Sequence, residues 1–144
     1  FADKRQFEYP VVPQRGITLS REDASNLAQA KSANYCGQLI VMRELGVEPE
    51  QIDGLYLAGG FANYVNIKSA IEIGFLPPVP EQRIYKIGNA AAQGARQILV
   101  SNQHRRIAEE IARKIEHVEL ETTPDFFEVF VDGCQFKPMP RQLT

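Results

Sequence analysis

The chain of 144 residues contains no tryptophan and only two cysteines, Cys36 and Cys134. These cysteines lie far apart and belong to no CxxC pattern, so by themselves they cannot hold a zinc ion or an iron–sulfur cluster. Such sparse use of cysteine is typical of proteins in a reducing compartment, and we therefore expect a cytoplasmic protein.

Long apolar runs and an excess of one charge are also missing. No run approaches the ~18 apolar residues that a membrane-spanning helix needs, and the polar opening of the chain lacks the pattern of a secretory signal. The formal net charge is −2, without the basic patch that is typical of a nucleic-acid-binding surface. We therefore expect neither a membrane nor a nucleic acid among the partners. Because the chain begins on Phe1 and not on methionine, we also expect a piece of a longer protein.

Helical and extended patterns alternate along the sequence, which predicts a single α/β domain with one mixed sheet and flanking helices. Ser20 is a predicted N-cap of a long helix, and Gly46 is expected to end it. Asn66 is a predicted cap of a short second helix. The predicted helices cover residues 21–45, 67–73, 90–100, 105–115 and 124–132. The predicted extended segments cover residues 7–12, 17–19, 55–58, 83–87 and 117–121.

The segment LYLAGGFAN, from Leu55 to Asn63, is the first candidate for a binding site. A hydrophobic strand that ends in Gly59-Gly60 lets the backbone turn sharply and approach a ligand without obstruction by a Cβ atom. Ligands of open α/β sheets lie beyond the carboxyl ends of the strands, where Asn63 can supply a side-chain amide. A strand followed by two glycines is also common in plain tight turns, and the sequence contains neither GxGxxG nor a Walker A loop. The pattern alone leaves both interpretations open.

Two further segments contain polar residues that such a ligand could contact. Asn89 follows the predicted strand over residues 83–87 and caps the next helix, whose positive end can face an anion. An ordinary junction between a strand and a helix is the alternative. On the long helix, Lys31, Asn34 and Gln38 follow helical spacing and form one polar stripe. Lys31 could reach a ribose hydroxyl or a phosphate, although a helix lysine commonly lies in solvent.

The sequence offers no constellation for nucleophilic or metal chemistry. It contains no serine elbow, no HExxH motif and no clustered pair of carboxylates, and His104 and His117 have no recognisable partner in the sequence. We therefore expect no catalytic residue and no metal ligand within this chain.

Four segments, taken in order, resemble one family: TLSREDASNLAQAKSA, IDGLYLAGGFANYVNIKSAIEIGFLP, YKIGNAAAQGARQILVS and IAEEIARKIEHVELETTPDFFEVFVDG. Over residues 17–136 the chain resembles the C-terminal part of the ATP-dependent reductive activators of corrinoid methyl-transfer proteins. That family belongs to the superfamily of acetate and sugar kinases, heat-shock chaperone ATPases and actin. The resemblance implies a ribonuclease-H-like (actin-superfamily) lobe, with residues 1–144 as a single C-terminal nucleotide-binding lobe.

In that superfamily a strand that ends in a Gly-Gly turn is the adenosine motif. The resemblance implies that the glycine turn and the asparagine after it line the adenine and ribose, while the long helix contacts the nucleoside. The implied site residues are Gly59, Gly60, Asn63, Lys31, Asn34 and Asn89.

The phosphate-binding loops of the superfamily, and the acidic residue that organises magnesium, are expected upstream of this chain. The family's plant-type [2Fe–2S] domain is expected upstream as well. The resemblance implies that the intact protein binds ATP or ADP with Mg²⁺, hydrolyses ATP and delivers an electron from the iron–sulfur domain to the cobalt(II) of a corrinoid protein, its partner. We expect the isolated chain to be inactive as an ATPase.

Two alternatives remain open. The chain could be a lobe of a small-molecule kinase of the same superfamily, whose acceptor site lies elsewhere. It could also be an interaction module, for example the contact surface of a homodimer, that binds no nucleotide.

Overall fold

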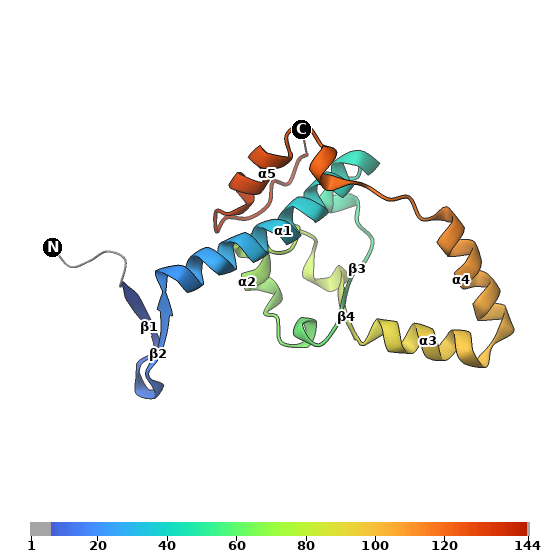
Figure 1. Ribbon diagram of the computed structural model, residues 1–144, viewed down its shortest axis with the longest axis horizontal. Coiled ribbons are helices and arrows are strands. Elements are labelled where there is room, and N and C mark those ends of the chain that lie inside the picture. Colours follow the sequence, from blue (N-terminus) through green and yellow to red (C-terminus); the bar gives the residue numbers. More distant parts are fainter. Residues whose placement is uncertain (1–6, 144) are drawn as a thin grey trace.

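The computed structural model describes residues 7–143, in which one long helix, α1, lies at the centre with smaller elements around it (Figure 1). The strands are β1 (Glu8–Val12), β2 (Ile17–Ser20), β3 (Leu55–Ala58) and β4 (Ile84–Gly88). The helices are α1 (Arg21–Leu45), α2 (Ile67–Glu72), α3 (Ala90–Val100), α4 (Asn102–Lys114) and α5 (Phe126–Gly133). Short 3-10 turns lie between them, of which η4 (Phe61–Asn63) and η6 (Leu120–Thr122) matter below. The alternation of helices and strands confirms the predicted α/β class.

Helix α1 begins and ends where the sequence predicts. The Oγ atom of Ser20 accepts a hydrogen bond from the backbone N–H of Asp23 at 3.0 Å, and the Asp23 carboxylate accepts one from the Ser20 N–H at 2.9 Å. These two bonds form a capping box, which satisfies backbone donors at the start of the helix. At the other end Gly46 has a φ of 61°, in the left-handed region that glycine adopts without steric cost.

Helix α5 packs along α1, and together they form the main core (Figure 1). Gly133 permits this close approach, because a Cβ atom at this position would lie 2.6 Å from the Oγ atom of Ser32. That hydroxyl donates a hydrogen bond to the Phe130 carbonyl at 2.5 Å. The buried members of the core are Tyr35, Cys36, Leu39, Ile40, Met42, Val129 and Met139.

The strands form two small sheets. β1 and β2 pair antiparallel as a hairpin that precedes α1, whereas β3 and β4 pair parallel near the middle of α1 (Figure 1). Within residues 7–143 these two sheets are separate, and the single mixed sheet of the sequence analysis is not formed. Periodicity in a sequence identifies extended segments, but it does not determine which of them pair.

Three predicted elements differ from the structure by more than one residue. The strand predicted over residues 117–121 is wrong, because this segment is an irregular connection that ends in η6. The alternating apolar side chains of this segment, Val118 and Leu120, pack against the core. The backbone of the segment pairs with no described strand. Helix α4 begins at Asn102, three residues earlier than predicted, since the Oγ atom of Ser101 caps it by accepting the His104 N–H. Helix α5 begins at Phe126, two residues later than predicted.

Helices α3 and α4 extend away from α1, and the chain returns to α5 through η6 (Figure 1). In the described part of the chain, no helix combines the length and the apolar character that crossing a membrane requires.

Candidate functional site

The carboxyl ends of β3 and β4 lie side by side and bring the two glycine-containing junctions together. Ala58 is opposite Gly88 in the parallel register, and the backbone N–H of Gly59 donates a hydrogen bond to the Gly88 carbonyl at 2.7 Å. Gly59 and Gly88 have φ values of 93° and 64°, where a side chain would be strained. The Gly59-Gly60 turn and Asn89 therefore meet at one edge of the sheet.

Gly60 differs from these two glycines, because neither its backbone conformation nor its packing within the chain requires a glycine at this position. Its φ and ψ are −64° and −38°, which any L-residue adopts. A Cβ atom built on it would meet no atom within 4 Å. The backbone at Gly60 therefore faces open space, into which a ligand can approach closely.

The chain continues from Gly60 into the 3-10 turn η4, which presents Asn63 to solvent. Ala62 is buried and anchors the turn, whereas Asn63 is exposed. The amine of Lys86, on β4, donates hydrogen bonds to the backbone carbonyls of Asn63 at 3.2 Å and Val65 at 2.7 Å. The loop after β3 is thus tied to the neighbouring strand. Lys86 is not among the site residues predicted from the sequence, although a lysine within the apolar strand IYKIG is a visible signal.

Asn89 caps helix α3, as predicted. Its Oδ1 atom accepts a hydrogen bond from the backbone N–H of Ala92 at 3.0 Å, and Asn89 itself is exposed. Because the Gly88 carbonyl is hydrogen-bonded to the Gly59 N–H, the positive N-terminal end of α3 lies next to the glycine turn. A helix N-terminus at this place favours an anionic group of a ligand.

A shallow hollow of about 320 Å³ lies between α1 and β3, beside η4. Asn34 and Gln38 line it from α1, as the polar stripe predicts, and apolar side chains of β3 line it from the other side. The side-chain amides of Asn34 and Gln38 both donate hydrogen bonds to the Phe75 carbonyl, at 2.7 Å and 3.0 Å. Asn34 therefore shares this hollow with Ala58 and Phe61, which flank the glycine turn, and its amide nitrogen is already hydrogen-bonded.

Lys31 does not join the other predicted site residues. Its amine donates a hydrogen bond to the carbonyl of Gln135, after α5, at 2.6 Å, and lies over the ring of Tyr35 at 5.1 Å from the ring centroid. The residue is only 1% exposed, which excludes the alternative that it lies in solvent. Burial lowers the pKa of the Lys31 amine from its ordinary value.

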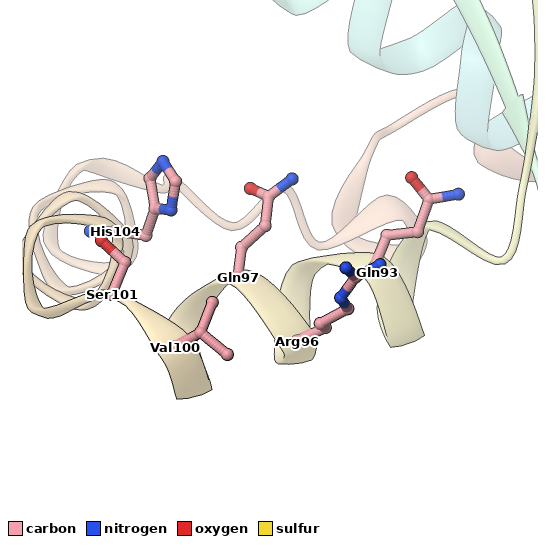
Figure 2. Close-up of a pocket in the computed structure, with 6 residues that line it drawn as sticks. All are labelled: Gln93, Arg96, Gln97, Val100, Ser101 and His104. Atoms are coloured by element: carbon pink, nitrogen blue, oxygen red, sulfur yellow. Dashed lines mark hydrogen bonds between the residues drawn. The ribbon is translucent and has the colours of Figure 1, made fainter.

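A second hollow, of about 510 Å³, lies between α3 and α4 (Figure 2). The side chains of Gln93, Gln97 and His104 point to the same side of the helix pair (Figure 2). The hollow lies along α3, beyond the strand ends, and it contains no group paired for acid–base work. Within residues 7–143, no cluster of three histidine, cysteine, aspartate or glutamate residues could hold a metal ion.

Residues 2–143 match the model of the family described as the C-terminal domain of RACo, the ASKHA domain. The chain belongs to this family. The match confirms the family and the actin-like fold that the four sequence segments indicate, and with them the ribonuclease-H-like class.

Two curated relatives are similar over most of the chain. The corrinoid activation enzyme RamQ of Eubacterium limosum is 30% identical over 122 residues, which are 85% of this chain and 21% of the relative. The [Co(II) methylated amine-specific corrinoid protein] reductase of Methanosarcina barkeri is 25% identical over 113 residues, which are 77% of this chain and 21% of the relative. The chain thus spans about a fifth of the length of the relatives it matches.

A solved structure supports the fold directly. The structure of a reductive activator for corrinoid, iron-sulfur protein superimposes with a TM-score of 0.76 at 34% sequence identity. The superposition covers 85% of this chain and 19% of that chain. The arrangement of elements in Figure 1 therefore corresponds to a segment of a much larger protein in that structure.

Proposed function

We propose that this chain is the nucleoside-binding part of an ATP-dependent activator that reduces the cobalt(II) of a corrinoid protein. One observation carries the proposal: the hydrogen bond from Gly59 to Gly88 places two glycine-containing strand ends and a helix N-terminus around one open space. The names of the relatives give the reaction class, corrinoid activation and reduction. We propose that residues 1–144 form a single C-terminal lobe of the longer activator.

The residues at the strand ends suit a nucleoside. The bare backbone at Gly60 permits close approach of a flat base or a ribose, and Asn63 and Asn89 supply exposed side-chain amides. Asn34 borders the same region from α1. We assign the nucleoside site to these residues together with Gly59. For Lys31 we propose a supporting role, in which it joins α1 to the segment after α5.

The bound cofactor is proposed to be ATP or ADP with Mg²⁺. The phosphates and the metal would be held by parts of the activator outside this chain, and a [2Fe–2S] domain outside it would supply the electron. When bound, the nucleotide supplies free energy that shifts the protein between two lobe arrangements, because its contacts differ between them. We propose a cytoplasmic protein whose partner is a corrinoid protein, with a homodimer as a further assembly to test.

Gly60→Val in the intact activator tests the site. We expect the valine side chain to occupy the space of the ligand and to abolish binding of ATP and ADP, as measured by titration calorimetry. The fold should tolerate the substitution, because the conformation of Gly60 is an ordinary helical one and no atom lies near the added Cβ.

Gly94→Val is the matched control, because a Cβ atom at Gly94, in the middle of α3, also meets no atom within 4 Å. This variant should bind nucleotide as the wild type does. Wild-type affinity in Gly60→Val would refute the site assignment. Failure of the wild-type protein to bind either nucleotide would instead support the interaction-module alternative.

A further inference from the structure

Lys86 lies within β4, opposite Leu57 of β3, and its side chain reaches the loop that follows Gly60. Its Nζ atom donates hydrogen bonds to the carbonyls of Val65 at 2.7 Å and Asn63 at 3.2 Å. Hydrogen bonds from a charged donor are shorter and stronger than those between neutral groups. Because both acceptors are backbone carbonyls, these contacts determine the path of the main chain on either side of Tyr64.

We propose that Lys86 is a positioning residue of the nucleoside site, which holds the loop of residues 59–65 in the conformation that receives the ligand. This inference rests on the proposed function. It assigns to the site a residue that does not itself touch the nucleoside. The residue acts through Asn63, whose backbone it holds and whose side-chain amide faces solvent beside the glycine turn.

The loop depends on Lys86 because it has few other attachments. Ala62 is buried, and the ring of Phe61 contacts the ring of Phe75 edge-on, with 6.0 Å between the centroids. Phe61 and Tyr64 are nevertheless 72% and 89% exposed. Exposed segments with few buried contacts open most readily. Removal of the amine is therefore expected to populate loop conformations that cannot bind.

Arg83 provides a matched control within the same region. Its Nη1 atom donates to the carbonyls of Glu50 at 2.9 Å and Ile52 at 3.1 Å. This contact has the same chemistry, a cation bound to two backbone carbonyls two residues apart. It lies at the amino end of the β3–β4 pair, away from the glycine turn. Loss of the Arg83 contact should affect stability, whereas loss of the Lys86 contact should affect the site.

The experiment compares Lys86→Met, Lys86→Arg and Arg83→Met in the intact activator. When only a fraction of the protein has a binding-competent loop, the apparent affinity equals the intrinsic affinity multiplied by that fraction. Loss of one or two hydrogen bonds corresponds to a roughly 5- to 20-fold weaker affinity for ATP and ADP in Lys86→Met, measured by titration calorimetry. Lys86→Arg keeps a charged donor and should remain within about threefold of the wild type. Arg83→Met should lower the melting temperature and leave the affinity unchanged.

Hydrogen exchange of the backbone amides provides a second measurement that needs no nucleotide. Residues 60–65 should exchange faster in Lys86→Met than in the wild type, and Arg83→Met should not change their exchange. If Lys86→Met does not fold, Lys86→Gln, which keeps a neutral donor, replaces it with a smaller expected loss.

Wild-type affinity and wild-type exchange in Lys86→Met would overturn the role of Lys86 and leave the proposed function intact. An equal loss of affinity in Arg83→Met would overturn it too, because the effect would then be one of general stability. If the wild-type protein binds neither nucleotide, the proposed function fails, and the role of Lys86 at that site fails with it.

Discussion

Replacement of Lys31 by methionine is expected to destabilise the lobe without removing a contact to the nucleotide. Methionine keeps most of the buried aliphatic stem but removes the amine, so the Gln135 carbonyl loses the donor at 2.6 Å and keeps only the Lys137 N–H at 3.0 Å, while the Tyr35 ring loses the cation. A hydrogen bond from a charged donor contributes about 1.5–3 kcal/mol, and a desolvated cation–π contact contributes about 2 kcal/mol. Removal of a charge that is costly to bury offsets part of this loss. We expect a net decrease of about 1–3 kcal/mol in the free energy of unfolding.

Urea denaturation measures the stability of Lys31→Met, and titration calorimetry measures its affinity for ATP and ADP. Lys137→Met is the control, because Lys137 forms a largely exposed ion pair with Asp132 at 2.6 Å, and such pairs contribute only about 0–1 kcal/mol. If Lys31→Met is less stable but its folded form binds ATP and ADP with unchanged affinity, the structural role proposed for Lys31 is supported. Lower affinity with unchanged stability would refute the reasoning, since it would show that the amine contacts the ligand directly.

Two further predictions concern the packing of α1 against α5. A Cβ atom added at Gly133 would lie 2.6 Å from Ser32 Oγ and 2.9 Å from the Tyr35 ring. Gly133→Ala should therefore lower the free energy of unfolding, measured by urea denaturation, by about 1–3 kcal/mol. An unchanged free energy of unfolding would contradict this prediction and show that α5 can shift. Burial and the nearby Asp132 carboxylate raise the pKa of Tyr35 from 10.0 to about 12. The unfolded chain therefore releases this proton first, and stability should fall as the pH rises from 10.0 to about 12. Tyr35→Phe should lack that part of the decline, and an equal decline in both proteins would contradict the prediction.

Elements that depend on short-range signals were predicted from the sequence. The ends of α1 follow from the capping box at Ser20 and the left-handed glycine at Gly46, both of which act within a few residues. Asn66 and Asn89 cap their helices for the same reason, each accepting a backbone N–H three residues ahead. The strand Leu55–Ala58 and its glycine turn were predicted because a short apolar run before two glycines is a local pattern.

The errors occur where residues distant in sequence decide the outcome. Residues 117–121 contain an alternating pattern, but no described strand pairs with them, and their apolar side chains pack on α1 instead. The apolar Phe127 of α5 is likewise 71% exposed, because Phe126 and Phe130 lie on the face of this helix that packs against the core. The pairing of strands likewise depends on contacts that no local pattern encodes.

The candidate site shows the same division. The sequence by itself identified Gly59-Gly60 and Asn89 as candidate site residues, since two glycines after a strand and a capping asparagine are local patterns. Tertiary structure alone decided that these two junctions meet, through the parallel pairing of β3 with β4. The tertiary structure also determines that the two lysine side chains have different hydrogen-bond partners. The amine of Lys31 is buried against residues 104 positions away, whereas that of Lys86 reaches the loop beside the glycine turn. The partner of a long side chain depends on which groups the fold brings near it. The spacing of residues along one helix or strand does not predict that partner.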